Sequence, residues 1–581
     1  MKKQELFFNI TGGDGVECRL SSVKDKGEIK IYNFDLEWNE SASVNNAEVK
    51  LEWCVTMLEF MYRWSPLCGS NRNITPDWAG RRSSMLSVNA PTESIYNGQG
   101  SNRYTYAVSE CAKKIDFGTG VVEENGSLHF MVRTNLKQYA PGLKTNFSIY
   151  IDTRDIPVYE SVWDVAEWWA KECGMTPAEV PDAAFEPVYS FWYSYHQHLN
   201  AHEVEAECKR AKELGFDVCI VDDGWQTDDL NRGYAFCGDW EPAVSKMGDM
   251  AEHVERVHEI GMKYILWYSV PYIGCKSKNF DEFKDMILRD PHDNVAVFDP
   301  RYKKVREYLK GIYVKALNDW KLDGFKLDFI DMWGDRDANR PYNDKMDIPV
   351  LQDAVDAFMT DVISTLKAIK PDILLEFRQC YIGPNMRKYG NMFRVGDCPN
   401  DYINNRVGVL DLRTHLGDSA VHSDMLMWHP KERPEIAAIQ IINIIFGVMQ
   451  YSARLDSLTP EMKKMSRFWL DFMKKHKDLL LKSPVHTFDL QNLYTWAKTT
   501  RENECMIALF AADKCVKPDD VGVIYVANGC QSERALVECD GKYCVKIQNC
   551  FGDIISEEQS ELCGINAISV PVGGLITLTK I

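Results

Sequence analysis

Hydrophobic and polar positions follow different periods in different regions of the chain. Up to about residue 160, apolar and polar residues alternate, as in GEIKIYNFDLEW and SLHFMVRTNL, and turn-forming residues separate these runs. This pattern predicts an N-terminal antiparallel β-sandwich over residues 1–175. The same alternation returns after about residue 485, as in VGVIYVAN, and predicts a C-terminal antiparallel β-sandwich over residues 485–581.

Residues 185–480 instead alternate short apolar runs with amphipathic helical segments, which is typical of βαβ units. Asn200 can cap a helix over residues 201–214 and Gly215 can end it, so that FDVCIVDD follows as a buried parallel strand. The unit recurs at DGFKLDFID and at DILLEFRQCY. About eight strands can be counted, enough to close a central (β/α)8 TIM barrel.

Composition narrows the class of protein. The 581 residues carry a formal net charge of -18, which repels phosphate backbones and anionic lipids, so we expect neither a nucleic-acid nor a membrane partner. The amino terminus lacks the apolar run of a signal peptide, and the apolar stretch 436–449 is too short to cross a bilayer. We therefore predict a cytoplasmic protein. The 18 cysteines form no CxxC pair, which indicates reduced thiols and no zinc ribbon.

Several carboxylates close apolar runs, where the strands of a barrel end and catalytic groups are usually found. They are Asp222, Asp223, Asp328, Glu376, Asp397 and Asp424. Cleavage of a glycosidic bond typically uses two carboxylates. Lys326 lies two residues before Asp328, on the same face of a strand, and its charge can keep that carboxylate ionised.

Aromatic residues accompany these carboxylates. Trp225 follows the Asp222–Asp223 pair closely, and an aromatic face at that place favours sugar binding. Trp192 and Trp267 also close strands. Core packing is the usual role of such side chains, so only their clustering around the same mouth of the barrel would indicate a sugar-binding site.

Taken in order, the motifs PVYSFWYSY, VDDGWQ, KYILWYSVP, DGFKLDF and RVGDCPND resemble those of the retaining α-galactosidases of glycoside hydrolase family 36, with the related family 27. The resemblance covers roughly residues 185–450. It implies that Asp328 is the nucleophile and Asp397 the general acid/base of a double displacement that needs no metal and no organic cofactor. It also implies small oligosaccharides or α-glycosides as substrates, and a homo-oligomer.

The same resemblance assigns Asp222, Asp223 and Lys326 to sugar hydroxyls and places Trp192 and Trp267 along the sugar pocket. The chain departs from the family in two segments. In LEFRQCYIG, Arg378 and Gln379 replace a motif rich in cysteine and glycine. Arg378 either meets an anionic group on the substrate or pairs with Glu376 as a structural bridge, and we favour the bridge.

The second departure lies around the acid/base segment. Arg394 stands where the family usually has tryptophan, and we count Arg378 and Arg394 among the candidate substrate-binding residues. Asp401 is the second candidate for the acid/base. These departures leave open an α-N-acetylgalactosaminidase or another modified-sugar α-glycosidase, an α-galactosyl transglycosylase, and a non-catalytic sugar-binding protein.

Overall fold

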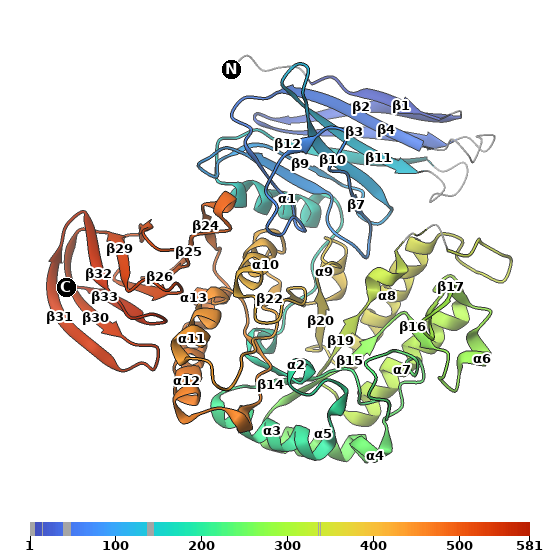
Figure 1. The fold of residues 1–581 in the computed structure, drawn as a ribbon. Coiled ribbons are helices and arrows are strands. Elements are labelled where there is room, and N and C mark those ends of the chain that lie inside the picture. The colour runs from blue at the N-terminus through green and yellow to red at the C-terminus, as the bar shows by residue number, and fades with distance from the viewer. Residues whose placement is uncertain (1–5, 14, 39–47, 136–143, 335, 337–338) are drawn as a thin grey trace.

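The computed structural model describes residues 6–13, 15–38, 48–135, 144–334, 336 and 339–581. In the N-terminal part of these residues, two facing sheets form a sandwich (Figure 1). One sheet contains β1 (Asn9–Gly12), β4 (Glu48–Thr56), β11 (Ser127–Asn135), β10 (Ile115–Val122), β6 (Thr75–Pro76) and β7 (Arg82–Ser84). The other contains β2 (Val16–Lys26), β3 (Ile29–Trp38), β12 (Lys144–Asp152), β9 (Asn102–Val108), β8 (Thr92–Tyr96) and β5 (Tyr62–Trp64).

Alternate residues of these strands point into the space between the two sheets and form their core. Trp53 and Phe130 stack there with ring centroids 5.3 Å apart, and Phe34 is fully buried beside them. Helix α1 (Val158–Glu172) follows the sandwich and lies between it and the barrel (Figure 1). The predicted β-sandwich is therefore confirmed.

Eight parallel strands in the described part of the chain form the central barrel. Their order is β22 (Ala420–His422), β21 (Met392–Arg394), β20 (Leu374–Arg378), β19 (Gly324–Asp328), β15 (Lys263–Ser269), β14 (Val218–Val221), β13 (Val188–Ser190) and β23 (Gln450–Tyr451). A parallel bridge between His422 and Val448 brings the two ends of this order together. The predicted barrel is confirmed.

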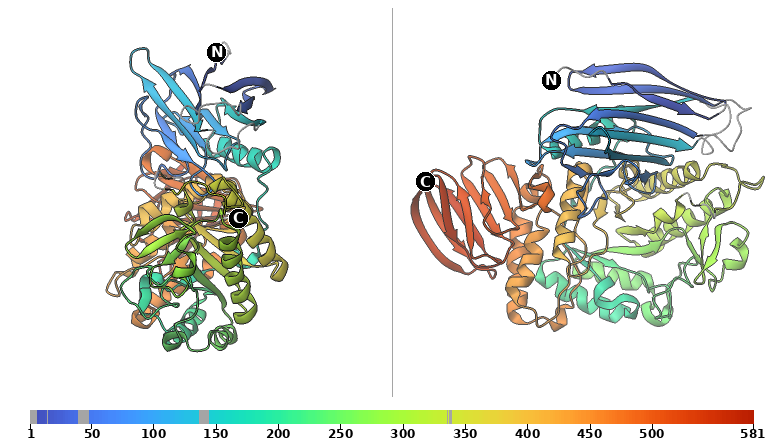
Figure 2. Two further views of the ribbon diagram at one scale, coloured as in Figure 1. Left: turned by 90° about the vertical axis from the view of Figure 1, so that its right-hand side faces the viewer. Right: turned by 45° about the horizontal axis from the view of Figure 1, so that its top comes forward.

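Helices surround the barrel strands (Figures 1 and 2). The longer ones are α3 (Ala201–Leu214), α5 (Met250–Ile260), α7 (Lys303–Trp320), α8 (Leu351–Ile369), α10 (Tyr402–His415), α11 (Pro434–Asn443) and α12 (Pro460–Lys475). Single-turn helices are α2 (Trp192–Tyr195), α4 (Val244–Met247), α6 (Phe280–Phe283), α9 (Met386–Tyr389) and α13 (Lys477–Leu481). A small sheet of β16 (Tyr272–Gly274), β18 (Val295–Phe298) and β17 (Ile287–His292) is inserted before α7.

The C-terminal part consists of two further sheets that share one apolar core (Figure 1). The larger sheet contains β24 (His486–Phe488), β25 (Trp496–Arg501), β26 (Glu504–Leu509), β28 (Val523–Asn528), β33 (Leu575–Lys580), β30 (Gly541–Gln548) and β31 (Ile554–Leu562). The smaller contains β27 (Cys515–Val516), β29 (Arg534–Glu538) and β32 (Ile565–Ser569). The boundaries predicted at residues 175, 185, 480 and 485 stay predictions.

A buried polar cluster joins the N-terminal sandwich, the barrel and the C-terminal part. Asp411, on α10, accepts hydrogen bonds from Trp64 Nε1 at 2.8 Å and from Arg72 Nη2 at 3.0 Å, both on the N-terminal side. The Tyr494 hydroxyl, from the chain leading into β25, donates to the same carboxylate. The helix after the acid/base segment is thus held from two sides.

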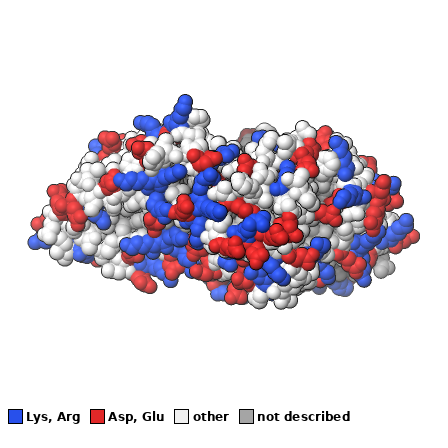
Figure 3. All heavy atoms as spheres, turned by 90° about the horizontal axis from the view of Figure 1, so that it is seen from below, with Lys and Arg blue, Asp and Glu red and all other residues white. Residues whose placement is uncertain are grey.

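Charges on the lower face of the molecule are of both signs. Figure 3 shows lysine and arginine side chains interspersed with aspartate and glutamate across this face. Despite the net charge of -18, this face therefore does not carry a large patch of one sign of charge. No helix in the described part of the chain is long and apolar enough to cross a membrane.

Candidate active site

Asp328 is the last residue of β19, so its side chain stands where the strand meets the barrel mouth. Its carboxylate is 9% exposed and receives four hydrogen bonds. Oδ1 accepts from Arg378 Nε at 2.8 Å, from the backbone N–H of Phe329 at 2.8 Å, and from the hydroxyl of Tyr381. Oδ2 accepts only one of the four, from Trp267 Nε1 at 3.1 Å.

These contacts keep Asp328 ionised. Burial raises the pKa of a carboxyl group, but here the charges of Arg378 and Lys326 and the hydrogen bonds outweigh burial and hold the pKa of Asp328 well below its usual range. A carboxylate must be ionised to attack a carbon atom. The environment of Asp328 therefore fits the nucleophile predicted from the sequence.

Lys326, Asp222 and Asp223 form a second polar group beside Asp328. Lys326 Nζ lies 2.6 Å from Asp222 Oδ2, and both side chains are buried. Asp223 accepts from the side-chain amides of Gln197 and Gln226, each at 2.6 Å. Burial raises the pKa of Asp223 to about 6.

Gly224 permits the close packing that places Asp223. Its φ of +116° suits glycine, and a Cβ atom there would lie 2.6 Å from the Cα atom of Gln197. The backbone of Gln197 can therefore approach closely enough for its amide to reach Asp223. The glycine of VDDGWQ is explained by this contact.

Asp397 lies in the loop between β21 and α10 and is half exposed, with its side chain 52% accessible. Arg394 Nη2 donates to its Oδ1 at 2.8 Å. Burial raises the pKa of Asp397, but the charge of Arg394 outweighs that effect, so the net shift is downward. Arg378 and Arg394 are paired in register on β20 and β21, and because the first contacts Asp328 and the second contacts Asp397, the two carboxylates lie at the same part of the barrel mouth.

Arg394 is itself buried among carboxylates. It donates to Asp424 and lies 3.7 Å from Glu376, and all three side chains are buried. Tyr193 also donates to Asp424, at 3.0 Å. Arg394 thus holds Asp397 in place, in addition to being a candidate substrate-binding residue.

Two sequence-based assignments are wrong. Trp225 is fully buried, stacks against Trp240 and donates its Nε1 to the carbonyl of Trp267, so it is a core residue and cannot stack on a sugar. The favoured bridge between Arg378 and Glu376 does not form. Arg378 pairs with Asp328 instead, and Glu376 accepts from Gln450.

Asp401 has a structural role in this fold. It is the N-cap of α10, where its side chain accepts from the backbone N–H of Asn404 at 3.0 Å. This assignment favours Asp397 over Asp401 as the acid/base. The two other tryptophans differ from each other, because Trp267 contacts Asp328 while the half-buried Trp192 packs edge-on against His196.

Sequence reasoning missed the hydrogen-bond partners of the site carboxylates. They are Tyr381 for Asp328, Gln197 and Gln226 for Asp223, and Tyr193 with Asp424 for the environment of Arg394. Tyr381 follows β20 and reaches Asp328 on the neighbouring strand, which no local pattern encodes. Within the described residues, no group of three or more histidine, cysteine, aspartate or glutamate side chains could hold a metal ion.

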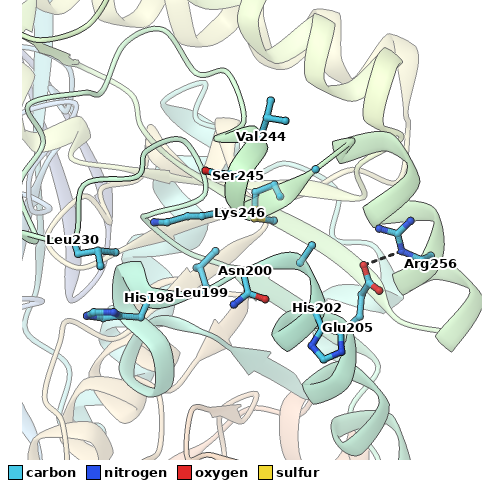
Figure 4. Close-up of a pocket in the computed structure, with 13 residues that line it drawn as sticks. His198, Leu199, Asn200, His202, Glu205, Leu230, Val244, Ser245, Lys246 and Arg256 are labelled. Atoms are coloured by element: carbon cyan, nitrogen blue, oxygen red, sulfur yellow. Dashed lines mark hydrogen bonds and ion pairs between the residues drawn. The ribbon is translucent and has the colours of Figure 1, made fainter.

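A separate cavity of about 710 Å³ opens between the start of α3 and the loop that carries α4 (Figure 4). Lys246 lines it and donates to the backbone carbonyls of Gln197 and Gly224. An ion pair between Glu205 and Arg256 lies on its far side. Neither Asp328 nor Asp397 lines this cavity, so it is distinct from the candidate active site.

The chain is similar to known proteins in both sequence and fold. The melibiase family model matches residues 186–483, slightly more than half of the chain. An α-galactosidase of Lactobacillus acidophilus is 27% identical over 256 residues, which cover 41% of this chain and 32% of that protein. A bifunctional α-galactosidase/sucrose kinase of Mediterraneibacter gnavus is 31% identical over 127 residues, covering 21% and 14%. The matched stretches thus span a third or less of these relatives.

Solved structures share the fold over nearly the whole chain. A variant of the α-galactosidase AgaA from Geobacillus stearothermophilus, solved in complex with raffinose, superposes with a TM-score of 0.64 at 13% identity, covering 99% of this chain and 87% of that one. A family 31 sulfoquinovosidase of E. rectale superposes with a TM-score of 0.60 at 11% identity, covering 100% and 94%. The fold therefore does not identify the sugar that this chain would bind.

Proposed function

This chain belongs to the melibiase family, and we propose that it is a retaining, exo-acting α-glycoside hydrolase, α-galactosidase-like, for small α-glycosides or oligosaccharides. One observation carries the proposal. Asp328 and Asp397 are held at the barrel mouth by arginines paired in register on neighbouring strands, Arg378 and Arg394, one carboxylate buried with four donors and the other half exposed. Two carboxylates in unlike surroundings are what a double displacement needs.

In the first step, an oxygen of Asp328 forms a bond to the anomeric carbon. The bond from that carbon to the leaving oxygen breaks, and its electron pair stays on the leaving oxygen, which takes a proton from Asp397. The product of this step is a glycosyl ester of Asp328. Asp397 must therefore bind a proton before each turnover, against the charge of Arg394.

In the second step, Asp397 is ionised and removes a proton from water while the water oxygen attacks the anomeric carbon. The ester bond breaks and its electron pair returns to Asp328. The charge of Arg394 lowers the pKa of Asp397 and so favours the ionised form from which this step starts. Two inversions give net retention of configuration.

The surroundings of Asp222, Asp223 and Lys326 support hydroxyl recognition. Their buried carboxylates and ammonium group lie next to Asp328 and can accept from and donate to sugar hydroxyls. The raffinose complex of the Geobacillus enzyme suggests small galactosides as first substrates to try. N-acetylgalactosaminides, a transglycosylation step and a purely sugar-binding role remain the alternatives, and a cytoplasmic location and a homo-oligomer remain predictions from the sequence.

The test is hydrolysis of nitrophenyl α-glycosides: galactoside, N-acetylgalactosaminide, glucoside and a uronide. We expect the wild-type protein to release nitrophenol from one of them and Asp328→Asn to lose that turnover while still binding the sugar in calorimetry. Proton NMR of the first sugar released should show the α-anomer. A first-formed β-anomer would overturn the retaining mechanism, and sugar binding by the wild type without turnover would favour the sugar-binding alternative.

A further inference from the structure

The two oxygens of the Asp328 carboxylate differ in how many donors they receive. A carboxylate oxygen offers about two lone-pair sites. Oδ1 receives three donors, from Arg378, Phe329 and Tyr381, so none of its lone pairs is left to attack carbon. Oδ2 receives one donor, from Trp267, and keeps a lone pair.

The direction of the Tyr381 hydroxyl follows from its neighbours. The backbone N–H of Phe329 also points at the Tyr381 oxygen, at 3.3 Å, so this oxygen accepts there and its own proton is free to point at Asp328. The guanidinium group of Arg378 lies over the Tyr381 ring, 5.3 Å from its centroid. Tyr381 is fully buried, so water does not compete for the hydroxyl.

The segment that carries Tyr381 is anchored from outside the barrel. The backbone N–H of Asn89, on the N-terminal side, donates to the carbonyl of Cys380 at 2.9 Å. The side chain of Gln379 accepts from the N–H of Gly396 at 3.0 Å, next to Asp397. Tyr381 is therefore held between the N-terminal sandwich and the acid/base loop.

We propose that Tyr381 is a positioning residue that holds Oδ1 of Asp328 out of the reaction, so that Oδ2 is the oxygen that bonds to the anomeric carbon. This inference rests on the proposed function. Tyr381 is fully buried and donates to Asp328. It acts through the nucleophile.

The hydrogen bond affects the two steps differently. A donor on a carboxylate stabilises the anion more than the ester. In the first step, loss of the donor makes Asp328 more basic and loosens its orientation, and these effects oppose each other. In the second step Asp328 is the leaving group, and a more basic carboxylate leaves more slowly. Loss of Tyr381 should therefore slow ester hydrolysis more than ester formation.

The experiment compares Tyr381→Phe with Tyr389→Phe. Tyr389 lies in the same connection between β20 and β21 and likewise donates to a carboxylate, that of Asp356, away from Asp328. Steady-state and stopped-flow release of nitrophenolate from p-nitrophenyl α-galactoside, or from whichever α-glycoside of the panel the wild type cleaves, give kcat and kcat/KM. Melting temperatures are recorded for each variant.

For Tyr381→Phe we expect kcat to fall about tenfold, the size expected for one hydrogen bond to a charged group, and kcat/KM to change less than about threefold. KM should fall with kcat, and a burst of nitrophenolate should mark the accumulated ester. Tyr389→Phe should keep the wild-type values. Equal losses in kcat and kcat/KM without a burst, or no change in either, would overturn the proposal.

One further variant and the wild-type assay keep the result interpretable. Arg378→Lys removes the Nε donor from the same oxygen and should lower kcat more than kcat/KM as well, which covers the case in which Tyr381→Phe does not fold. A wild-type protein that cleaves no member of the panel contradicts the proposed function itself. A wild type that turns over beside an unaffected Tyr381→Phe contradicts only the role of Tyr381.

Discussion

At the scale of single residues, Asp223 carries a pH-dependent share of the stability. Burial raises its pKa to about 6, whereas an unfolded aspartate titrates at about 3.9. Between these values the folded protein holds a proton that the unfolded chain has lost. Folding is therefore favoured at the acidic end of this window, and that contribution is lost as pH rises through about 6.

We predict that Asp223→Asn removes this dependence. Relative to the wild type, the free energy of unfolding of the variant should rise between about pH 4 and about pH 7, by at most about 3 kcal/mol. Urea denaturation at several pH values measures it. The exposed Asp285→Asn serves as the control and should follow the wild type at every pH. A constant difference between Asp223→Asn and wild type would contradict the raised pKa.

The sequence located the charged residues of the site but not all of their roles. Asp222, Asp223, Lys326 and Asp328 could be found because strand ends mark the mouth of a barrel. The direction in which the Trp225 side chain points could not be predicted, because strand alternation stops before it and Gly224 turns the chain at a positive φ. The partner of Arg378 depends on which neighbouring strand offers a carboxylate, and that is a tertiary property.

At the scale of elements, the N-terminus of α10 separates two carboxylates with different functions. Asp401 caps the helix and Asp397 precedes it. We predict that Asp401→Ala lowers the free energy of unfolding by about 1 kcal/mol and leaves kcat within about twofold, because only the cap is lost. Thermal denaturation and the glycoside assay measure the two effects.

Two further variants complete this comparison. Asp401→Asn keeps a capping side chain and should restore most of the stability. Asp397→Asn should lower the turnover of substrates with poor leaving groups by about 10²–10⁴-fold, the usual contribution of acid catalysis. Loss of turnover in Asp401→Asn to the same extent would move the acid/base role to Asp401.

Helix ends could be predicted where cap residues were explicit. The helix expected over residues 201–214 has those bounds, since Asn200 accepts from Glu203 N and Gly215 adopts a φ of +121°. The apolar run VYSFWYSYH gave no such signal. Only Val188–Ser190 is a strand there and α2 begins at Trp192, because the polar residues of this run, Ser190 and Ser194, do not alternate with apolar ones at a period that shows where the strand ends.

At the scale of the whole molecule, the buried pair of Arg72 and Asp411 holds three parts together, with both side chains 2% exposed. We predict that Asp411→Asn lowers the free energy of unfolding by about 3–5 kcal/mol, because it leaves the guanidinium of Arg72 buried without its counter-charge. Chemical denaturation measures the loss. The melting temperature should fall as well.

The exposed pair of Arg534 and Asp513 provides the matched control. Asp513→Asn also removes one carboxylate from an ion pair, but in a solvated place, and should cost less than about 1 kcal/mol. Similar losses in the two variants would show that the buried pair contributes no more than a surface pair. No local pattern indicates this cluster, since Asp411 lies more than 80 residues from each of its partners.

The cluster at Asp411 also bears on how such a protein can be altered by recombination. A chimaera that took its N-terminal sandwich from another protein would lack Arg72 and Trp64, and would leave the buried carboxyl group of Asp411 without two of its donors. A crossover before Tyr494 would remove a donor from the other side. The three regions are therefore expected to be inherited as one unit, and successful domain exchange should require transfer of these side chains together.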